Sequence, residues 1–220
     1  MTGPGPDDTA LLLGWRDAVR SAGAVAEADA VEAAGVALLA RWHEPHRRYH
    51  DAEHLGEVLA GVDVLAAHAG DPAAVRLAAW FHDAVYAGRP GDDEEASAGV
   101  ALEVLARLGV PGGRVVRVAG LVRMTARHEP AAGDPDAAVL SDADLAILAA
   151  PTDRYARYAA AVRAEYAHVP DAAFRAARAA VLTSLAGAAQ LYRTETGRAR
   201  WERAARANLA AEVALLSAGR

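Results

Sequence analysis

The spacing of apolar residues along the chain predicts a protein built from α-helices. Apolar side chains recur at intervals of three and four residues, alanine is abundant, and no stretch alternates between apolar and polar residues as a half-buried strand does. The segment that starts at Asp51 has apolar residues at positions 55, 58, 59, 62 and 65. These positions share one face of a helix, so we expect an all-α fold in which such faces are buried.

Prolines, glycines and capping residues divide this pattern into separate helices. Asp71 and Pro72 suit the start of one helix, and the Gly- and Pro-containing segment 87–92 ends it. A later helix is expected at SDADLAIL, capped by a Ser or an Asp of that segment. The expected helices cover about residues 11–19, 27–42, 51–65, 72–86, 93–108, 115–127, 141–148, 155–166, 173–185 and 198–216. We expect one domain over 1–220, with a flexible start at 1–6.

The stretch Leu77–Tyr86, LAAWFHDAVY, sets a chemical problem for such a fold. Its Ala, Leu, Trp and Phe residues predict a buried helix, and that helix would have to bury His82 and Asp83 side by side. Burying an unpaired carboxylate costs several kcal/mol or a large pKa rise, so both groups need a partner. A divalent cation suits both, because imidazole nitrogen and carboxylate oxygen are ligands for the same metals.

Composition and charge exclude several other kinds of site. The chain has no cysteine, so disulfides, thiolate metal sites and cysteine nucleophiles are excluded. All 23 basic residues are arginine, which excludes a lysine Schiff base. The net charge of -6 argues against nucleic acid as the main partner. The first residues contain no basic region followed by a long apolar run, so we expect no signal peptide, no membrane span and a cytoplasmic protein.

Further candidate ligands occur on other expected helices. In chain order they are His54, the His82–Asp83 pair, His128, and the aspartates Asp142 and Asp144. His54, His82 and His128 stand at the inner edge of apolar stripes, so a bundle that buries these stripes would bring them toward one point.

This ordered pattern resembles the HD superfamily of metal-dependent phosphohydrolases, and in particular a small bacterial branch of predicted HD phosphohydrolases. The resembling segments are RRYHDAEHL (47–55), WFHDAVY (80–86), DDEEASA (92–98), TARH (125–128), SDADLAIL (141–148) and YARYAAAVRAEY (155–166). The resemblance implies an HD-type helical bundle with a metal-site core at about 47–150 and additional C-terminal helices at about 151–220. The dipeptide His-Asp is a weak signal by itself, whereas the ordered set is specific.

The resemblance also implies roles for particular residues. It assigns His54, His82 and Asp83 as metal ligands, together with one aspartate of Asp142 and Asp144; the other is expected to cap a helix. The implied cofactor is one divalent ion, which can be Mn, Fe, Co, Ni, Zn or Mg.

Catalytic roles follow from the same resemblance. Asp83 or Glu94 would act as base toward a metal-activated water, and His128 fits a substrate-facing or second-metal position. The chain has Asp93 where the family pattern leads us to expect an asparagine. Four arginines flank the expected pocket and are candidates to clamp phosphate: Arg47, Arg48, Arg123 and Arg127.

We therefore expect a metal-dependent phosphohydrolase that acts on a small phosphorylated metabolite such as a nucleotide. One alternative is an HD-type di-iron oxygenase, which would need more histidines than His128 between the His-Asp pair and the last aspartate. Another is a non-catalytic ligand-binding module that keeps the metal for stability. A homodimer is a further expectation, because the three C-terminal helices can either complete the core or form a dimer face.

Overall fold

The structure, a computed structural model, describes residues 8–218 and confirms the all-α prediction. This part of the chain contains ten α-helices, two short 3-10 helices and no strand. None of its helices combines the length and the apolar character that crossing a membrane requires. The expected flexible start at 1–6 lies outside the described residues.

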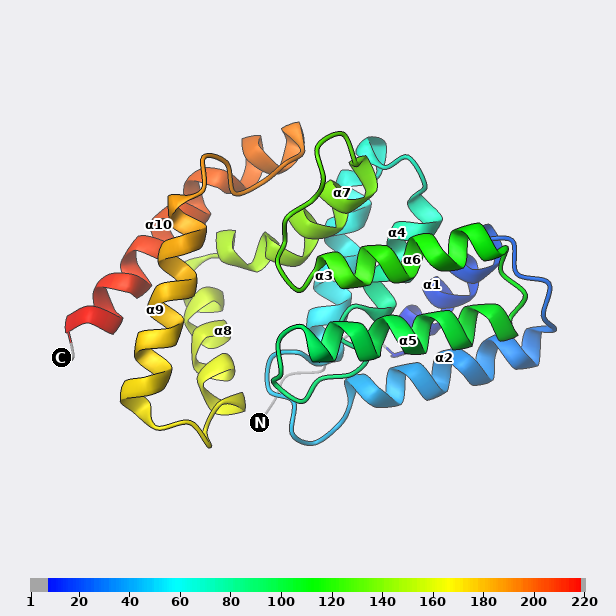
Figure 1. The fold of residues 1–220 in the computed structure, drawn as a ribbon, viewed down its shortest axis with the longest axis horizontal. Coiled ribbons are helices and arrows are strands. Elements are labelled where there is room, and N and C mark those ends of the chain that lie inside the picture. Colours follow the sequence, from blue (N-terminus) through cyan, green and yellow to red (C-terminus); the bar gives the residue numbers. More distant parts are fainter. Residues whose placement is uncertain (1–7, 219–220) are drawn as a thin grey trace.

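The helices follow the apolar pattern closely in most of the chain, and Figure 1 shows their arrangement. Their bounds are α1 Asp8–Ser21, α2 Ala28–Trp42, α3 Ala52–Leu65, α4 Pro72–Phe81, α5 Asp92–Arg107, α6 Gly112–Met124, α7 Pro135–Asp144, α8 Thr152–Glu165, α9 Asp171–Gly187 and α10 Glu195–Ala218. The 3-10 helices are Ala66–His68 and Leu145–Ala149.

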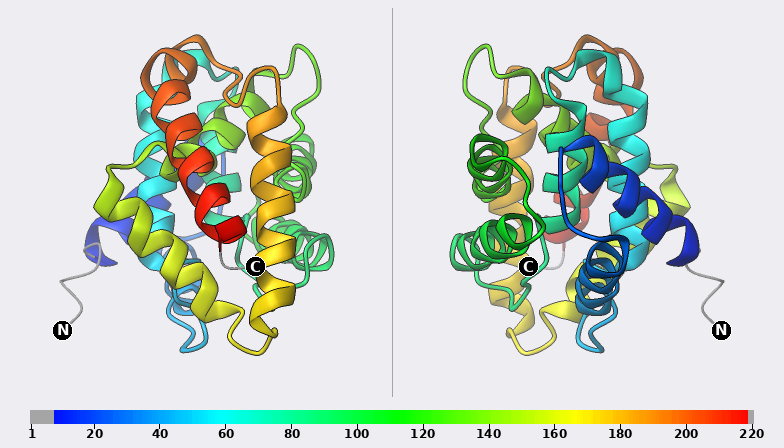
Figure 2. Two further views of the ribbon diagram at one scale, coloured as in Figure 1. Left: turned by 90° about the vertical axis from the view of Figure 1, so that its left-hand side faces the viewer. Right: turned by 90° about the vertical axis from the view of Figure 1, so that its right-hand side faces the viewer.

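The helices form two groups, each with its own cluster of buried apolar side chains. Helices α8, α9 and α10 gather on one side of the molecule and α1 to α7 on the other (Figures 1 and 2). The first cluster is built by α1 to α7 and the second by the C-terminal helices with Tyr49 and Leu148, while Trp201 packs against both. The C-terminal helices are thus packed onto the central part. The expectation of a single domain over 1–220 stays a prediction.

The end of α4 differs from the expectation that His82 and Asp83 lie inside a buried helix. Helix α4 ends at Phe81, so both residues lie in the turn that follows. The backbone N–H of Ala84 donates to the Phe81 carbonyl at 3.1 Å, which is the tighter spacing of a turn. The buried Arg47 takes up the next carbonyls, since its guanidinium donates to those of Asp83 at 2.9 Å and Ala84 at 3.4 Å. These bonds hold the turn that carries His82 and Asp83.

Helix α7 begins earlier than the sequence pattern indicates. Asp134 is its N-cap and accepts from the backbone N–H of Ala137 at 3.0 Å, and Pro135 occupies the first turn. The segment SDADLAIL therefore begins at the C-terminal end of α7 and continues as a 3-10 helix. Consequently neither Asp142 nor Asp144 caps the start of an α-helix, and the expected capping role is wrong for both.

Arg47 is occupied by the protein itself and is not free to clamp a phosphate. Its guanidinium also donates to the His50 carbonyl at 2.8 Å and to Glu44 Oε2 at 3.2 Å, and it lies over the rings of Trp42 and Tyr86. Arg47 therefore ties the 43–51 connector to the turn that carries His82 and Asp83.

We predict that Arg47→Met lowers the free energy of unfolding by about 3 kcal/mol, because three carbonyls in partly or fully buried surroundings lose a charged donor. Urea unfolding of the metal-free protein measures this change. Arg48→Met is the matched control, since Arg48 is exposed. Equal stability of the Arg47 variant and the wild type would show that Arg47 does not hold the turn.

Candidate metal centre

Helices α3, α4 and α7 bring two histidines and two aspartates to one point. We call this group, which consists of His54, His82, Asp83 and Asp144, the cluster. His54 lies in the first turn of α3, whose N-cap Asp51 accepts from the His54 backbone N–H at 3.3 Å. His82 and Asp83 occupy the turn after α4, and Asp144 is the last residue of α7. Segments separated by up to 90 residues thus meet because their apolar faces pack together.

The nitrogens of the two histidines face each other within this cluster. His54 Nε2 and His82 Nε2 are 3.2 Å apart, and Asp144 Oδ1 lies 3.2 Å from the former and 3.7 Å from the latter. Ligand atoms of His54, His82 and Asp144 all lie within 4.8 Å of one another. Asp83 Oδ2 lies 3.3 Å from His82 Nε2 and 3.8 Å from His54 Nε2. The group of His54, His82 and Asp144 can hold a metal ion, and Asp83 lies beside it.

Contacts around the two imidazoles orient them for this role. His82 Nδ1 lies 2.8 Å from the Ala79 carbonyl, so it carries the hydrogen and leaves the Nε2 lone pair toward the cluster. The Trp42 ring packs against His82, with ring centroids 5.4 Å apart, and the Tyr49 ring packs against His54 at 4.6 Å. Aromatic packing and one backbone bond therefore fix where the nitrogens point.

The side chain of His54 makes its polar contacts through Nε2, with other members of the cluster. Its Nδ1 is buried and has no hydrogen-bond partner among the described residues, a state that costs about 1–3 kcal/mol. Its Nε2, in contrast, faces His82, Asp83 and Asp144. The Nε2 contacts are therefore the polar interactions that hold this imidazole in place.

The charges in the cluster are strongly coupled. Burial alone would lower the pKa of His82, but the charges of Asp83 and Asp144 raise that pKa to about 9. Burial alone would raise the pKa of each aspartate, but the neighbouring His82 charge holds the pKa of both well below its usual range. The two carboxylates therefore stay ionised and require positive charge beside them, which a proton or a divalent cation can supply.

Asp142, the other aspartate of SDADLAIL, points away from the histidines. It is fully buried, and its Oδ1 accepts from the Arg193 backbone N–H at 2.7 Å. Its Oδ2 accepts from the backbone N–H and the hydroxyl of Thr194, both at 2.8 Å. Thr194 in turn precedes α10, and its hydroxyl accepts from the Gly197 N–H. Of the two aspartates left open by the sequence, the structure brings Asp144 to the cluster and uses Asp142 to hold the start of α10.

His128 lies at the edge of the cluster on the side of Asp144. Its Nε2 is 3.5 Å from Asp144 Oδ2, and its Nδ1 is 3.4 Å from the Ser141 hydroxyl. Its backbone has a φ of 50°, in the left-handed region that is uncommon for residues other than glycine. The turn after α6 is therefore held in a strained conformation that directs this imidazole toward Asp144.

Glu94 and Asp93 serve the start of α5 instead of the cluster. Glu94 Oε2 accepts from the Gly91 backbone N–H at 2.5 Å, as in a helix cap. Asp93, at the position where asparagine was expected, accepts from the N–H groups of Ala87 and Arg89 at 2.8 Å each. No contact joins Glu94 to the histidines, so the structure gives its expected role as base no support. Arg123, another expected phosphate clamp, pairs with Glu95 at 2.6 Å.

A second pair of residues beside the cluster is not evident from the sequence. His50 Nδ1 lies 2.7 Å from Glu165 Oε2, although 115 residues separate them in the chain. Both residues fall within segments that carry the HD resemblance, RRYHDAEHL and YARYAAAVRAEY. The sequence allows His50 as a residue beside the ligands, because it stands four residues before His54, but helix periodicity alone would not join it to Glu165.

Comparison of the chain with protein-family models, with curated proteins and with solved structures gives no match. The chemistry of the site has to be deduced from its own residues. These establish a group that can hold a metal ion, on an all-α scaffold.

The contrast between the two aspartates can be tested with isosteric variants. We predict that Asp144→Asn weakens binding of a divalent metal by more than about 100-fold, because even partners outside the first ligands are worth 10–100-fold. Asp142→Asn should keep the metal stoichiometry of the wild type but lower the free energy of unfolding by about 2 kcal/mol. Isothermal titration with Mn²⁺ or Zn²⁺ and urea unfolding measure the two effects. The reverse pattern would make Asp142 the ligand.

Proposed function

We propose that this protein is a metal-dependent phosphohydrolase of the HD type that acts on a small phosphorylated metabolite such as a nucleotide. The observation that carries the proposal is that the Nε2 atoms of His54 and His82 lie 3.2 Å apart. A carboxylate oxygen of Asp83 and one of Asp144 each lie within 3.8 Å of both nitrogens. The order of these residues along the chain supports the HD type. His54, His82, Asp83 and Asp144 would hold the metal.

The cluster is buried on one side and open on the other. The side chains of His54 and His82 are 2% and 1% exposed, whereas those of Asp83, Asp144 and His128 are 15%, 13% and 21% exposed. Solvent and substrate would therefore approach across the two carboxylates and His128. A divalent ion held here would lower the pKa of a bound water and polarise a phosphoryl oxygen.

Side chains of the protein would supply the remaining catalytic roles. The low pKa of Asp83 makes it a good ligand and a weak base, because a base works best with a pKa near the working pH. His128 lies beside Asp144 with Nδ1 near Ser141, so its Nε2 faces Asp144, and its side chain is 21% exposed. We assign His128 to contact substrate or the attacking water, and Asp83 to the metal.

The direct test is a screen of nucleotides and sugar phosphates with Mn, Fe, Co, Ni, Zn and Mg. The wild type should release phosphate from at least one class in a metal-dependent way. His82→Ala should lose about 1000-fold in kcat/KM, since removing a ligand forfeits several kcal/mol of stabilisation of the transition state. His68→Ala is the matched control, because His68 contacts Thr196 and lies outside the cluster.

Three outcomes would contradict the proposal. Equal activity of His82→Ala and the wild type would remove the cluster from catalysis. Two irons per chain together with consumption of dioxygen would indicate the oxygenase. Metal binding that raises the melting temperature, with no turnover of any phosphate ester or anhydride, would indicate the non-catalytic module.

A further inference from the structure

The side chain of Glu165, at the end of α8, reaches from the C-terminal helices into the connector before α3. It is 2% exposed, and its Oε1 accepts three consecutive backbone N–H groups: those of Arg48 at 2.8 Å, Tyr49 at 2.8 Å and His50 at 3.0 Å. Its Oε2 pairs with His50 Nδ1 at 2.7 Å. A buried carboxylate with this many donors has a single position.

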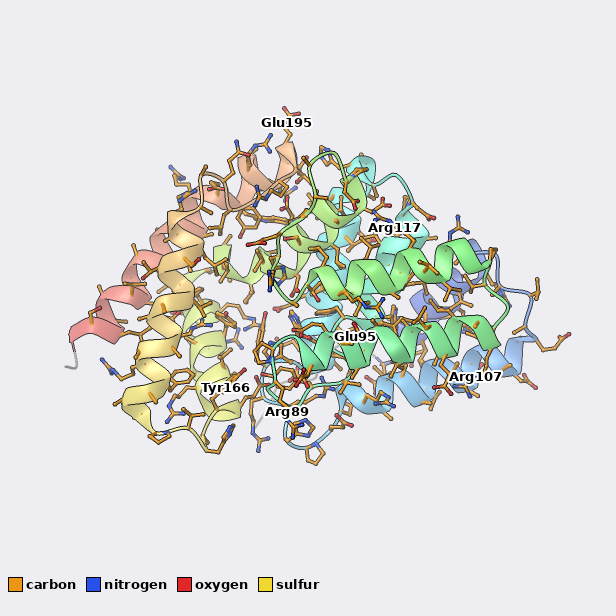
Figure 3. All side chains as sticks on the ribbon, viewed as in Figure 1. Arg89, Glu95, Arg107, Arg117, Tyr166 and Glu195 are labelled. Carbon is orange, nitrogen blue, oxygen red and sulfur yellow. The ribbon has the colours of Figure 1, made fainter. Side chains whose placement is uncertain are left out.

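The same oxygen is also bound from the turn region after α4. The hydroxyl of Tyr86 donates to Glu165 Oε2 at 2.9 Å. The neighbouring Tyr166 lies against this segment, since a Cβ on Gly88 would be 3.7 Å from its ring, and Figure 3 shows Tyr166 near Arg89. The end of α8 is therefore fixed to both segments that carry metal-ligand candidates.

These contacts determine how His50 is presented to the cluster. Its ring stacks on Tyr86, with centroids 4.2 Å apart, and meets the edge of His54 at 5.7 Å. Because Glu165 occupies Nδ1, the ring nitrogen left for another partner is Nε2. The side chain is 22% exposed and its ring contacts His54, so His50 is a solvent-accessible imidazole beside the cluster.

A phosphoryl group bound there needs positive or donor groups, and several arginines of this region are already paired. Arg47 is bound to carbonyls and to Glu44. Arg154 forms two bonds to Glu57, at 2.8 and 2.7 Å. Arg178 pairs with Glu212 at 2.9 Å. Breaking such a pair to bind substrate would leave a carboxylate without its partner. His50 faces the cluster without that conflict, because Glu165 binds its other nitrogen.

We propose that His50 is a substrate-binding residue that contacts a phosphoryl group through Nε2, and that Glu165 is its positioning residue. The proposal rests on the proposed function, because it concerns the same site. It gives the C-terminal helices a part in the chemistry, because α8 supplies the carboxylate that fixes the orientation of this imidazole. The ligand class is a phosphate monoester or its product, inorganic phosphate.

The test uses the full chain saturated with one divalent metal and inorganic phosphate as the probe, measured by isothermal titration at fixed pH. In Glu165→Gln the amide oxygen can still accept from the backbone, while the charge beside His50 is removed. We expect phosphate to bind at least tenfold more weakly to Glu165→Gln and to His50→Gln, with the metal stoichiometry of the wild type. The double variant should lose little more than either single one, because both act through one contact.

Glu212→Gln is the matched control, as Glu212 is a second glutamate of low exposure that pairs with Arg178 and Tyr155 in the C-terminal helices. It should lower the melting temperature and leave phosphate affinity unchanged. His50→Gln keeps the bonds from Glu165 to the backbone of residues 48 and 49. If Glu165→Gln does not fold, the phosphate affinity of His50→Gln therefore tests the proposal.

Wild-type phosphate affinity in metal-loaded His50→Gln, or no phosphate binding by the metal-loaded wild type, would overturn the proposal. A wild type that binds phosphate through His50 but hydrolyses no phosphate ester would support this inference while contradicting the proposed function. The two failures are therefore distinguishable.

Discussion

The structure depends on confining two ionised carboxylates and two imidazoles to one largely buried point. Asp83 and Asp144 approach the Nε2 atoms of His54 and His82, and the negative charges raise the pKa of His82 to about 9 in spite of its burial. Ionised carboxylates are not buried without positive charge beside them. Much of the surrounding structure can be understood as the support that this arrangement requires.

That support comes from several parts of the chain. Arg47 holds the turn after α4, and aromatic rings of Trp42 and Tyr49 pack against the two imidazoles. The C-terminal helices contribute through two buried carboxylates: Asp142 binds the start of α10, and Glu165 of α8 binds the connector before α3. Residues far from the cluster in sequence thus determine how rigidly its members are held.

The helical class and most helix positions could be predicted from sequence, because apolar spacing is a local signal. The apolar stripe at positions 55–65, for example, predicts helix α3 without any tertiary information. Two boundaries differ from the expectation. Helix α4 stops at Phe81, and the turn beyond it is held by Arg47, 36 residues before Asp83, which is a tertiary contact. Helix α7 starts at Pro135, earlier than expected, because Asp134 and Pro135 form a local N-terminal cap.

In the candidate site too, some features could be predicted from the sequence and others depend on tertiary contacts. The histidines and aspartates could be named from motif order, but the choice between Asp142 and Asp144 could not, because both lie two residues apart in the same segment. Their roles differ only through the partners they meet: Arg193 and Thr194 for Asp142, the two histidines for Asp144. The His50–Glu165 pair was hidden for the same reason, since it joins the connector to α8 across 115 residues.

The central claim is that His54, His82 and Asp144 bind one divalent metal ion. Anomalous X-ray diffraction from crystals of the metal-loaded protein, collected at the absorption edge of the metal, tests it most directly. We predict one strong anomalous peak within about 2.0–2.3 Å of His54 Nε2, His82 Nε2 and an oxygen of Asp144. A saturated protein whose metal peak lies elsewhere, or that shows no peak at these atoms, would contradict the account.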